Sequence, residues 1–171
     1  MSWILETPRL RLRQLTPADL DFMAEMLADA EVMRYYPRRL TRDLSADWIA
    51  RQMARYVADG HGLWLALERK TGNPVGQVGL VRQVVNGADE CEVGYLIHHP
   101  FWRHGFAAEG ALACRDYAFK TLGKPRVIAL VRPDNSASQG LARKLGMEII
   151  GRAPHGGREH LVFAVANPEC L

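Results

Sequence analysis

The segment Trp102-Arg103-His104-Gly105-Phe106-Ala107-Ala108 places small and basic residues immediately before an alanine-rich helical pattern. The first N–H groups of a helix have no acceptor within the helix, and the helix dipole adds partial positive charge there. Gly105 and the two alanines let a ligand approach the backbone closely, and Arg103 and His104 add donors beside it. This composition suits a phosphate or diphosphate site, although it would also serve as a simple turn into a helix.

A second group that could do chemistry is the carboxylate of Glu92, within the strand pattern of residues 91–98. Alternation puts Glu92 on the face shared by Gly94, Leu96 and His98, opposite Cys91, Val93, Tyr95 and Ile97. Gly94 inside a strand often marks a bulge or a close backbone approach. A carboxylate here could act as a general base, directly or through a water molecule. Other candidate bases, which the sequence does not place in space, are Glu68, Glu90, Glu159 and His160.

The rest of the chain must supply the elements that position these groups. The alternation of leucine and arginine in residues 9–15 predicts a half-buried strand, and the apolar run 126–131 is typical of a strand covered on both faces. We expect helices at 17–34, 42–58, 105–122 and 135–146, and further strands at 62–70, 75–85, 91–99, 147–153 and 160–166, with a turn over 86–90. This order predicts a mixed sheet with helices on its faces, an α/β fold.

Composition narrows the classes of partner. A net charge of +3 is too weak to indicate nucleic-acid binding, and no apolar run approaches the length of a membrane span. The N-terminal residues have no long apolar region of a signal peptide, and the three cysteines have no metal or redox spacing. Adjacent His98 and His99 point to opposite faces of a strand, so we expect no metal site there. These features favour a cytoplasmic protein with reduced thiols.

Four segments together resemble the GNAT superfamily of acetyl-CoA-dependent N-acetyltransferases, and most closely its branch of ribosomal-protein alanine N-acetyltransferases. They are "ETPRLRLRQLTPADL", "GNPVGQVGL", "EVGYLIHHPFWRHGFAAEGA" and "RPDNSASQGLARKLGM". The family's pyrophosphate loop, Q/R-x-x-G-x-G/A, matches residues 102–107, with Trp102 at its first position. The first of the four segments is shared with the family but carries no candidate chemistry.

The resemblance implies a single GNAT-like acetyltransferase domain over residues 1–171. Its central, mostly antiparallel sheet would splay at one parallel strand pair and be flanked by about four helices. The pantetheine arm of acetyl-CoA, the cosubstrate, would lie in the gap between the strands at 91–98 and 126–131 and pair with strand backbone. The implied cofactor-binding residues are Tyr95, Leu96 and Ile97 through their backbones, the loop residues Trp102, Arg103, His104, Gly105, Phe106, Ala107 and Ala108, and Asn135.

The reaction that the resemblance implies is direct attack of a neutral amine on the acetyl thioester, with Glu92 as base and Ser138 pointing towards the sulfur. Without the resemblance, Asn135 or Ser136 would be a helix N-cap and Ser138 a solvated residue. Many members carry a tyrosine acid where this chain has Ala142. Either Ser138 protonates the thiolate, or a thiol of pKa ~8.5 leaves unaided. The missing tyrosine also supports an alternative, a non-catalytic acetyl-CoA-binding or partner-docking module.

The acceptor would be a primary amine, and we expect a preference for a peptide N-terminus or a small amine. An α-amine of pKa ~7.8 is roughly 10–15% neutral at pH 7, whereas a lysine amine is about 0.04% neutral. The acceptor pocket is expected between the first two helices, whose connection holds Tyr35, Tyr36, Arg38, Arg39 and Trp48. Those side chains could bind a peptide or an acidic substrate, or belong to the core and the solvated surface. Monomer and homodimer both remain open.

Overall fold

Alternating leucines and arginines form strand β2 (Leu10–Arg13) in the computed structural model, which describes residues 2–171. Leu10 and Leu12 are fully buried, whereas Arg11 and Arg13 are partly exposed, so the predicted half-buried strand is confirmed. On one side β2 pairs with a short strand, β1 (Leu5–Glu6), that the sequence did not predict, and on the other with β3 (Leu63–Glu68).

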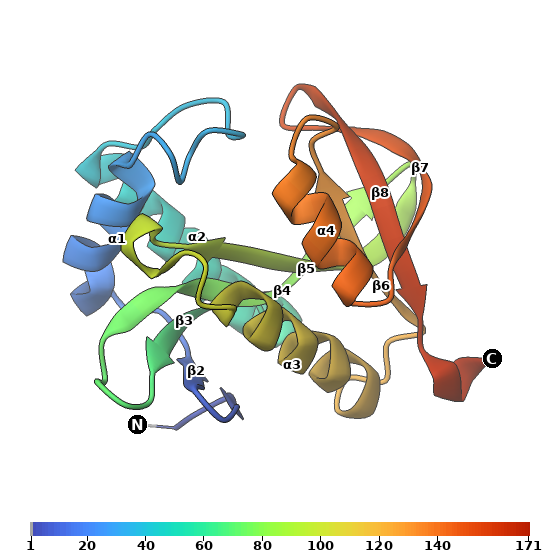
Figure 1. The fold of residues 1–171 in the computed structure, drawn as a ribbon, viewed down its shortest axis with the longest axis horizontal. Coiled ribbons are helices and arrows are strands. Elements are labelled where there is room, and N and C mark those ends of the chain that lie inside the picture. The colour runs from blue at the N-terminus through green and yellow to red at the C-terminus, as the bar shows by residue number, and fades with distance from the viewer. Residues whose placement is uncertain (1) are drawn as a thin grey trace.

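In the described part of the chain, eight strands make one sheet, in the order β1-β2-β3-β4-β5-β6-β8-β7. Figure 1 labels all of them except β1. The strands not yet given are β4 (Pro74–Val85), β5 (Ala88–Ile97), β6 (Arg126–Val131), β7 (Glu148–His155) and β8 (Arg158–Ala166). Every neighbouring pair is antiparallel except β5 and β6, which are parallel. The predicted mixed, mostly antiparallel sheet is therefore confirmed.

The hairpin between β4 and β5 is tighter than the turn predicted over residues 86–90. Only Asn86 and Gly87 form the turn, and both have positive φ, 49° and 81°. An Asn-Gly pair of this conformation matches the right-handed twist of the two strands. As a result β5 begins at Ala88, three residues before the predicted start at Cys91.

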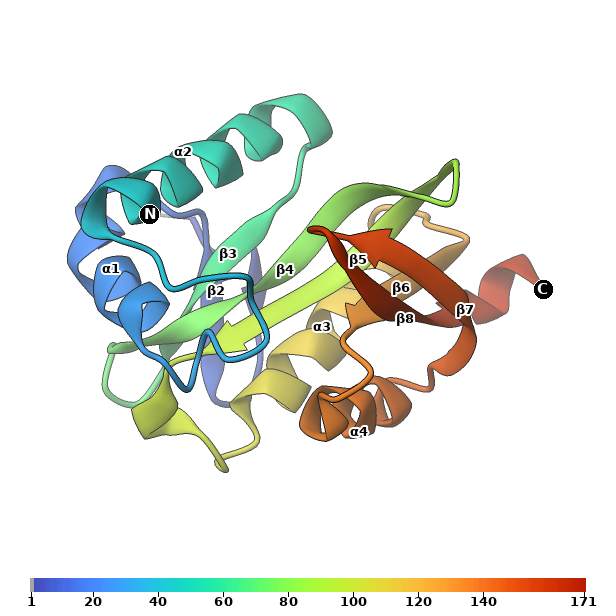
Figure 2. The ribbon, with the colours of Figure 1, turned by 90° about the horizontal axis from the view of Figure 1, so that it is seen from above.

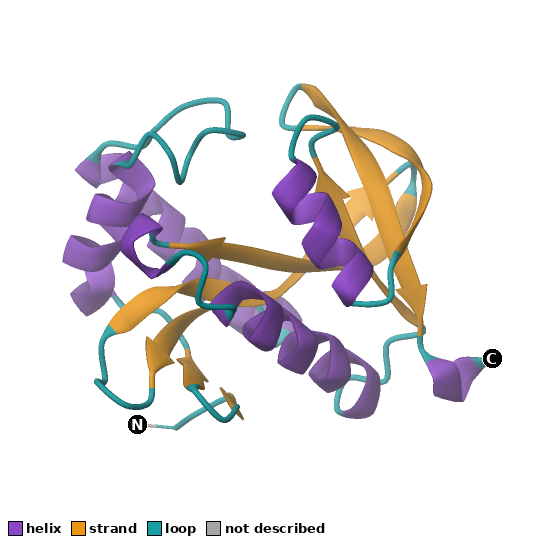
Figure 3. Ribbon diagram, in the orientation of Figure 1, coloured by secondary structure: helices purple, strands orange, loops and turns teal. Residues whose placement is uncertain are grey.

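Residues 2–171 contain four α-helices: α1 (Leu20–Ala28), α2 (Arg42–Asp59), α3 (Phe106–Lys120) and α4 (Ser136–Lys144) (Figure 3). The first is shorter than the predicted helix 17–34, because residues 17–19 form a 3-10 turn and Asp29 ends the helix. The Asp29 carboxylate accepts hydrogen bonds from the N–H groups of Glu31 and Val32, at 2.8 and 3.2 Å. Within residues 2–171, no helix has the length and apolar character needed to span a membrane.

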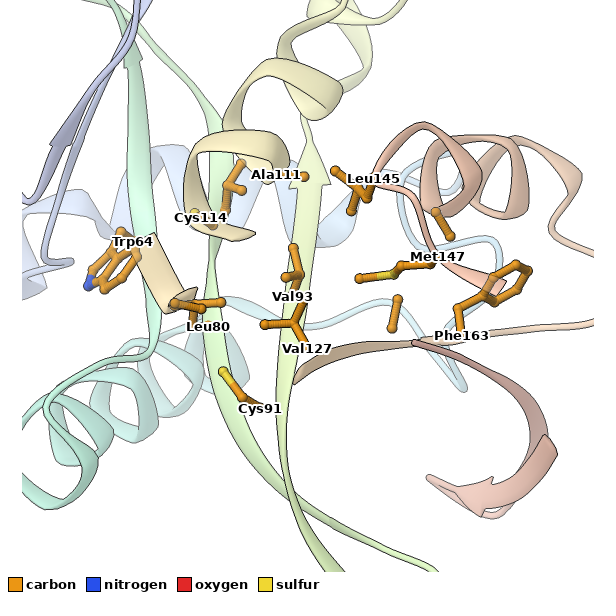
Figure 4. Close-up of a cluster of buried hydrophobic side chains, with 14 of the residues drawn as sticks. Trp64, Leu80, Cys91, Val93, Ala111, Cys114, Val127, Leu145, Met147 and Phe163 are labelled. Atoms are coloured by element: carbon orange, nitrogen blue, oxygen red, sulfur yellow. The ribbon is translucent and has the colours of Figure 1, made fainter. Parts of the chain in front are cut away.

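Helices α1 and α2 cover one face of the sheet, and α3 and α4 cover the other (Figure 2). Between the sheet and helices α3 and α4 lies the larger core, which includes Cys91, Val93, Cys114 and Phe163 (Figure 4). Beneath α1 and α2 lies a second cluster, in which Leu65 of β3 meets methionines and Ile49 of the helices. Along β5, odd-numbered residues therefore face α3 and α4, and even-numbered residues face α1 and α2.

Strands β5 and β6 are joined at a single residue pair, Glu92 and Ile128. Beyond that pair the two strands diverge (Figures 1 and 2). We name the unpaired parts, residues 93–97 of β5 and 129–131 of β6, the strand split. The predicted splay at the parallel pair is confirmed, and it opens at Glu92.

Candidate active site

The turn between β5 and α3 presents a row of main-chain N–H groups. Arg103 (φ 64°) and Gly105 (φ 79°) are both left-handed, so the chain curls sharply before α3 begins. Within residues 2–171, neither a side chain nor a carbonyl accepts a hydrogen bond from the N–H groups of residues 103–108. Such a concave set of free donors at a helix N-terminus is suited to an anion.

The direction of the main chain decides which β5 groups face the strand split. The N–H of His98 donates to the carbonyl of Val75 on β4, at 2.9 Å. Because peptide groups alternate along a strand, the N–H of Leu96 also faces β4, whereas those of Tyr95 and Ile97 face the strand split. The backbone interaction expected of three residues is therefore open to Tyr95 and Ile97.

Trp102, at the first position of the loop, contacts the C-terminal end of β5. Its indole N–H donates to the carbonyl of Ile97 at 2.7 Å, and its ring lies 4.6 Å from that of His99. The tryptophan thus ties the loop to the last residue of β5. The loop and the strand split are consequently held next to each other.

Glu92 lies where the two strands part, on the face covered by α1 and α2. Its Oε1 accepts from the side-chain amide of Gln83 at 3.3 Å, and the N–H of Leu130 on β6 also donates to it. Burial raises the pKa of this carboxyl to about 7, although those hydrogen bonds and the charge of Arg55 oppose the rise. A carboxyl of this kind takes up and releases a proton near neutral pH.

Three of the other candidate bases are bound by polar partners. Glu90 is buried in an ion pair with Arg126, Glu159 lies 3.0 Å from Arg152, and Glu68 accepts from the hydroxyl of Thr71. His160, on β8, packs against His155, with ring centroids 5.3 Å apart. Burial lowers the pKa of His155, and the neighbouring His160 and Arg55 lower it further. Among these groups, Glu92 is the one that pairs with β6 where the strand split opens.

On the opposite face of β5, the hydroxyl of Tyr95 reaches helix α4. It lies 2.7 Å from the hydroxyl of Ser138 and 3.3 Å from the Ser138 carbonyl. Burial raises the pKa of Tyr95, so this phenol stays protonated at neutral pH. Asn135 is the N-cap of α4, because its side-chain oxygen accepts from the N–H of Ser138 at 3.1 Å. Ala142 is fully buried in the core.

Aromatic side chains from the α1–α2 connection and from α2 gather on the Glu92 face. The rings of Tyr36 and Trp48 meet edge to face at 6.2 Å, and the Trp48 indole donates to Gln77 at 3.0 Å. Burial raises the pKa of Tyr36, and the charge of Glu92 adds to this shift. Of the other residues expected here, Tyr35 is half-buried, while Arg38 and Arg39 are exposed.

The two adjacent histidines each lie near a different carboxylate. His98 Nε2 is 3.4 Å from Glu25, and His99 Nδ1 is 3.9 Å from Asp29. In the part of the chain that the structure describes, no three His, Cys, Asp or Glu side chains are grouped so as to hold a metal ion. The cysteines of residues 2–171 are all free thiols.

Two contributors to this region were missed by the sequence reasoning. Arg9, immediately before β2, donates to the carbonyl of His104 in the loop. The Tyr95 hydroxyl reaches Ser138, although only the Tyr95 backbone had been assigned a role. Alternation alone places Arg9 on an exposed face and does not show what lies across that face.

Comparisons with known proteins agree with this geometry. A family model described as "Acetyltransferase (GNAT) domain" matches residues 9–148. The chain is 33% identical over 147 residues to "Uncharacterized N-acetyltransferase YoaA" of Bacillus subtilis (strain 168), covering 85% of this chain and 82% of that one. An acetyltransferase structure from Agrobacterium tumefaciens str. C58 superposes with a TM-score of 0.81 at 30% identity, over 94% and 92% of the chains. RimL, a "Ribosomal L7/L12 alpha-N-protein acetyltransferase in complex with Coenzyme A", has the same fold at 15% identity, with a TM-score of 0.79 over 96% and 98% of the chains.

Proposed function

The chain belongs to the GNAT acetyltransferase family, and from that premise we propose that it transfers the acetyl group of acetyl-CoA to a primary amine. The acceptor we propose is the α-amine of a protein or peptide N-terminus, or a small amine of similar basicity. The family match covers residues 9–148, which include the loop, the strand split and α4. The acetyltransferase class therefore follows from the family, and the acceptor is our own inference.

The observation that carries the proposal is that the loop with free main-chain N–H groups lies next to the unpaired edge of β5. The N–H groups of residues 103–108 have no acceptor within residues 2–171, and β5 is paired to β6 only at Glu92. A diphosphate fits the first feature, because it accepts several hydrogen bonds at a helix N-terminus. An extended amide-containing arm fits the second, because it can pair with the main chain of Tyr95 and Ile97.

In this arrangement the groups that transfer protons lie on opposite faces of β5, with Glu92 on one face and Ser138 on the other. Acetyl-CoA supplies an acetyl group activated as a thioester. Glu92 takes the proton of the acceptor ammonium and leaves a nucleophilic amine. An N–H of β5 at the strand split donates to the acetyl carbonyl oxygen as charge develops there. Ser138, whose hydroxyl contacts that of Tyr95, donates its proton to the sulfur when the carbon–sulfur bond breaks, and it regains a proton from the attacking nitrogen, which loses one as the amide forms.

The pKa of Glu92 favours an α-amine over a lysine side chain. A base with a pKa of about 7 is close to an α-amine at ~7.8, but more than three units below a lysine amine at ~10.4. Deprotonating a lysine ammonium therefore costs about 3.5 kcal/mol more than deprotonating an α-ammonium. RimL, which shares the fold, carries an α-N-protein acetyltransferase name, and this agrees with the same acceptor class.

A thiol-release assay with paired acceptors tests the proposal. One peptide would have a free N-terminus and no lysine, and its partner would have a blocked N-terminus and one lysine. Free amino acids and polyamines complete the panel. We expect thiol release with the free N-terminus or a small amine, and at least about tenfold less with the blocked lysine peptide. A preference for the lysine peptide would contradict the acceptor class.

The buried Ala142 favours a second candidate, a module that binds acetyl-CoA without turnover. Thermal unfolding with acetyl-CoA, with a mononucleotide as control, tests binding separately from chemistry. Stabilisation by acetyl-CoA without thiol release for any acceptor of the panel would establish the module and overturn the enzyme mechanism. Absence of stabilisation would overturn both.

We further propose that residues 1–171 form one acetyltransferase domain that works in the cytoplasm as a monomer or homodimer. Free thiols support that compartment, since Cys91 and Cys114 are buried and Cys170 is exposed without a disulfide partner in residues 2–171. Sedimentation of the purified chain, with and without acetyl-CoA, tests the oligomeric state.

A further inference from the structure

Arg9 immediately precedes β2 and contacts three residues of the loop–α3 junction. Its Nη1 donates to the carbonyl of His104 at 2.7 Å, and its Nε lies 2.6 Å from Oε2 of Glu109. Its main-chain N–H donates to the other Glu109 oxygen at 2.9 Å. The guanidinium also lies 4.8 Å above the ring centre of Phe106. One side chain thus joins the N-terminal strand to the loop and to the first turn of α3.

The carbonyl that Arg9 binds belongs to the residue between the two left-handed positions of the loop. Arg103 has φ 64° and Gly105 has φ 79°. A non-glycine residue in this region is strained and persists only where its surroundings enforce it. A donor fixed on the His104 carbonyl holds that peptide, and with it the direction in which the neighbouring N–H groups point.

Arg9 also compensates the negative charge of Glu109. Burial raises the pKa of Glu109, but hydrogen bonds from Thr7 and Arg9 outweigh it and lower the pKa overall, so the group is a carboxylate. A carboxylate in the first turn stabilises a helix, yet it would repel a diphosphate at the same helix end. Arg9, with its guanidinium on Glu109, offsets that repulsion.

We propose that Arg9 is a positioning residue for the diphosphate loop, which fixes the His104 peptide and neutralises Glu109 without touching the reacting atoms. The proposal rests on the proposed use of acetyl-CoA. With this role for Arg9, the N-terminal segment "TPRL" contributes to the site although it carries no candidate chemistry of its own. A part of the chain distant in sequence thereby sets the affinity of the loop.

The chain offers a matched control in Arg11, two residues further along and inside β2. Arg11 also pairs with a carboxylate, Glu6 at 3.1 Å, and also lies over an aromatic ring, Trp3 at 5.2 Å. It differs from Arg9 in having neither the loop nor α3 among its partners. Comparing Arg9→Ala with Arg11→Ala therefore separates loss of an ion-paired arginine at β2 from loss of the loop contact.

The test compares two acetyl donors, acetyl-CoA and S-acetylpantetheine, which lacks the diphosphate. For Arg9→Ala we expect KM for acetyl-CoA to rise at least about tenfold, with kcat within about threefold, because one charge-assisted contact and its neutralisation are lost. With S-acetylpantetheine, kcat/KM should stay within about twofold of the unsubstituted protein. Arg11→Ala should change neither. An equal loss with both donors would mean a general structural role and would overturn the proposal.

Two further variants check the mechanism. Arg9→Lys keeps the charge but cannot bind His104 and Glu109 as a fork, so an intermediate KM is expected, and it replaces Arg9→Ala if that variant does not fold. Adding Glu109→Gln to the Arg9 variant should recover at least about threefold in affinity, because the uncompensated carboxylate is gone. No recovery would remove the neutralising role.

Binding of CoA measured by calorimetry separates this inference from the proposed function. If the unsubstituted protein does not bind CoA, the proposed function fails. If it binds CoA and Arg9→Ala binds equally well, only the role of Arg9 is overturned.

Discussion

The hydroxyl of Tyr95 on β5 lies 2.7 Å from the hydroxyl of Ser138 on α4, so one hydrogen bond links the strand at the split to the last helix. The Ser138 main chain is held in turn by the N-cap Asn135. At the position of α4 where the family resemblance implies a tyrosine acid, the chain has the buried Ala142. A phenol is thus still present near the helix, but it comes from the strand.

For Ser138→Ala we expect kcat to fall about tenfold, with KM for acetyl-CoA within about twofold, because a hydroxyl donor to the leaving sulfur is lost. Steady-state kinetics with acetyl-CoA varied at saturating acceptor measure both constants. A rise in KM without a change in kcat would instead indicate that Ser138 contributes to binding alone.

For Tyr95→Phe we expect a smaller fall in kcat, about threefold to fivefold, because Ser138 loses its orienting partner but keeps its proton. The double variant should be no slower than Ser138→Ala, since the two hydroxyls act through one contact. Additive losses would show that Tyr95 and Ser138 act independently.

Glu92→Gln should lower kcat at least about tenfold and remove one limb of the pH profile. The unsubstituted protein needs Glu92 ionised, so kcat should fall as the pH drops below about 7. The glutamine variant has no titratable side chain at position 92 and should lose that limb, which kinetics between pH 5.5 and pH 9 would detect. If the limb persists, the base is another group.

The same substitution should stabilise the fold at alkaline pH. The raised pKa means that the folded chain binds the Glu92 proton more tightly than the unfolded chain, so stability declines as the pH rises from about 4.5 to about 7. Glutamine avoids this penalty, which is at most roughly 3 kcal/mol. Thermal unfolding at pH 8 should show a higher midpoint for Glu92→Gln, and near pH 4 the two proteins should coincide.

Gly105→Ala should raise the dissociation constant for CoA at least about tenfold. Its Cβ would lie 3.3 Å from Arg9 Nη2, and φ 79° is strained for alanine by roughly 1–2 kcal/mol. Gly60→Ala is the control, because Gly60 has φ 76° at the end of α2 and no atom within 4 Å of an added Cβ. Both variants should lose stability in thermal unfolding, but calorimetry should find weaker CoA binding only for Gly105→Ala.

Much of the fold could be predicted because the periodicity of apolar residues and the positions of turn-forming residues indicate the same elements along most of the chain. The run 126–131 is β6 as predicted, and the pattern 42–58 gave α2 to within a residue. The prediction of a helix over 17–34 was wrong beyond Ala28, because the Asp29 carboxylate accepts hydrogen bonds from N–H groups that follow the helix. Strand β1, with two residues, is too short to leave a periodic pattern.

The site was predictable where it depends on backbone shape and not where it depends on contacts distant in sequence. Gly105 before a helix pattern correctly indicated a turn into α3, whereas the binding role of the loop and the role of Glu92 as base stay predictions. The spacing of residues in the sequence does not indicate that Arg9 contacts His104, which is 95 residues away. Nor does sequence show that Gly94 makes room for Leu63, whose Cδ2 would lie 2.9 Å from an added Cβ.

The single parallel pairing at Glu92 should also be visible in the exchange of amide protons with solvent. Along β5, Leu96 and His98 donate towards β4, while Tyr95 and Ile97 donate towards the strand split. We therefore expect slow and fast deuterium uptake to alternate residue by residue at this end of β5. Saturation with CoA should slow the two fast positions and leave the slow ones unchanged, so the cosubstrate would supply the hydrogen bonds that the sheet itself omits.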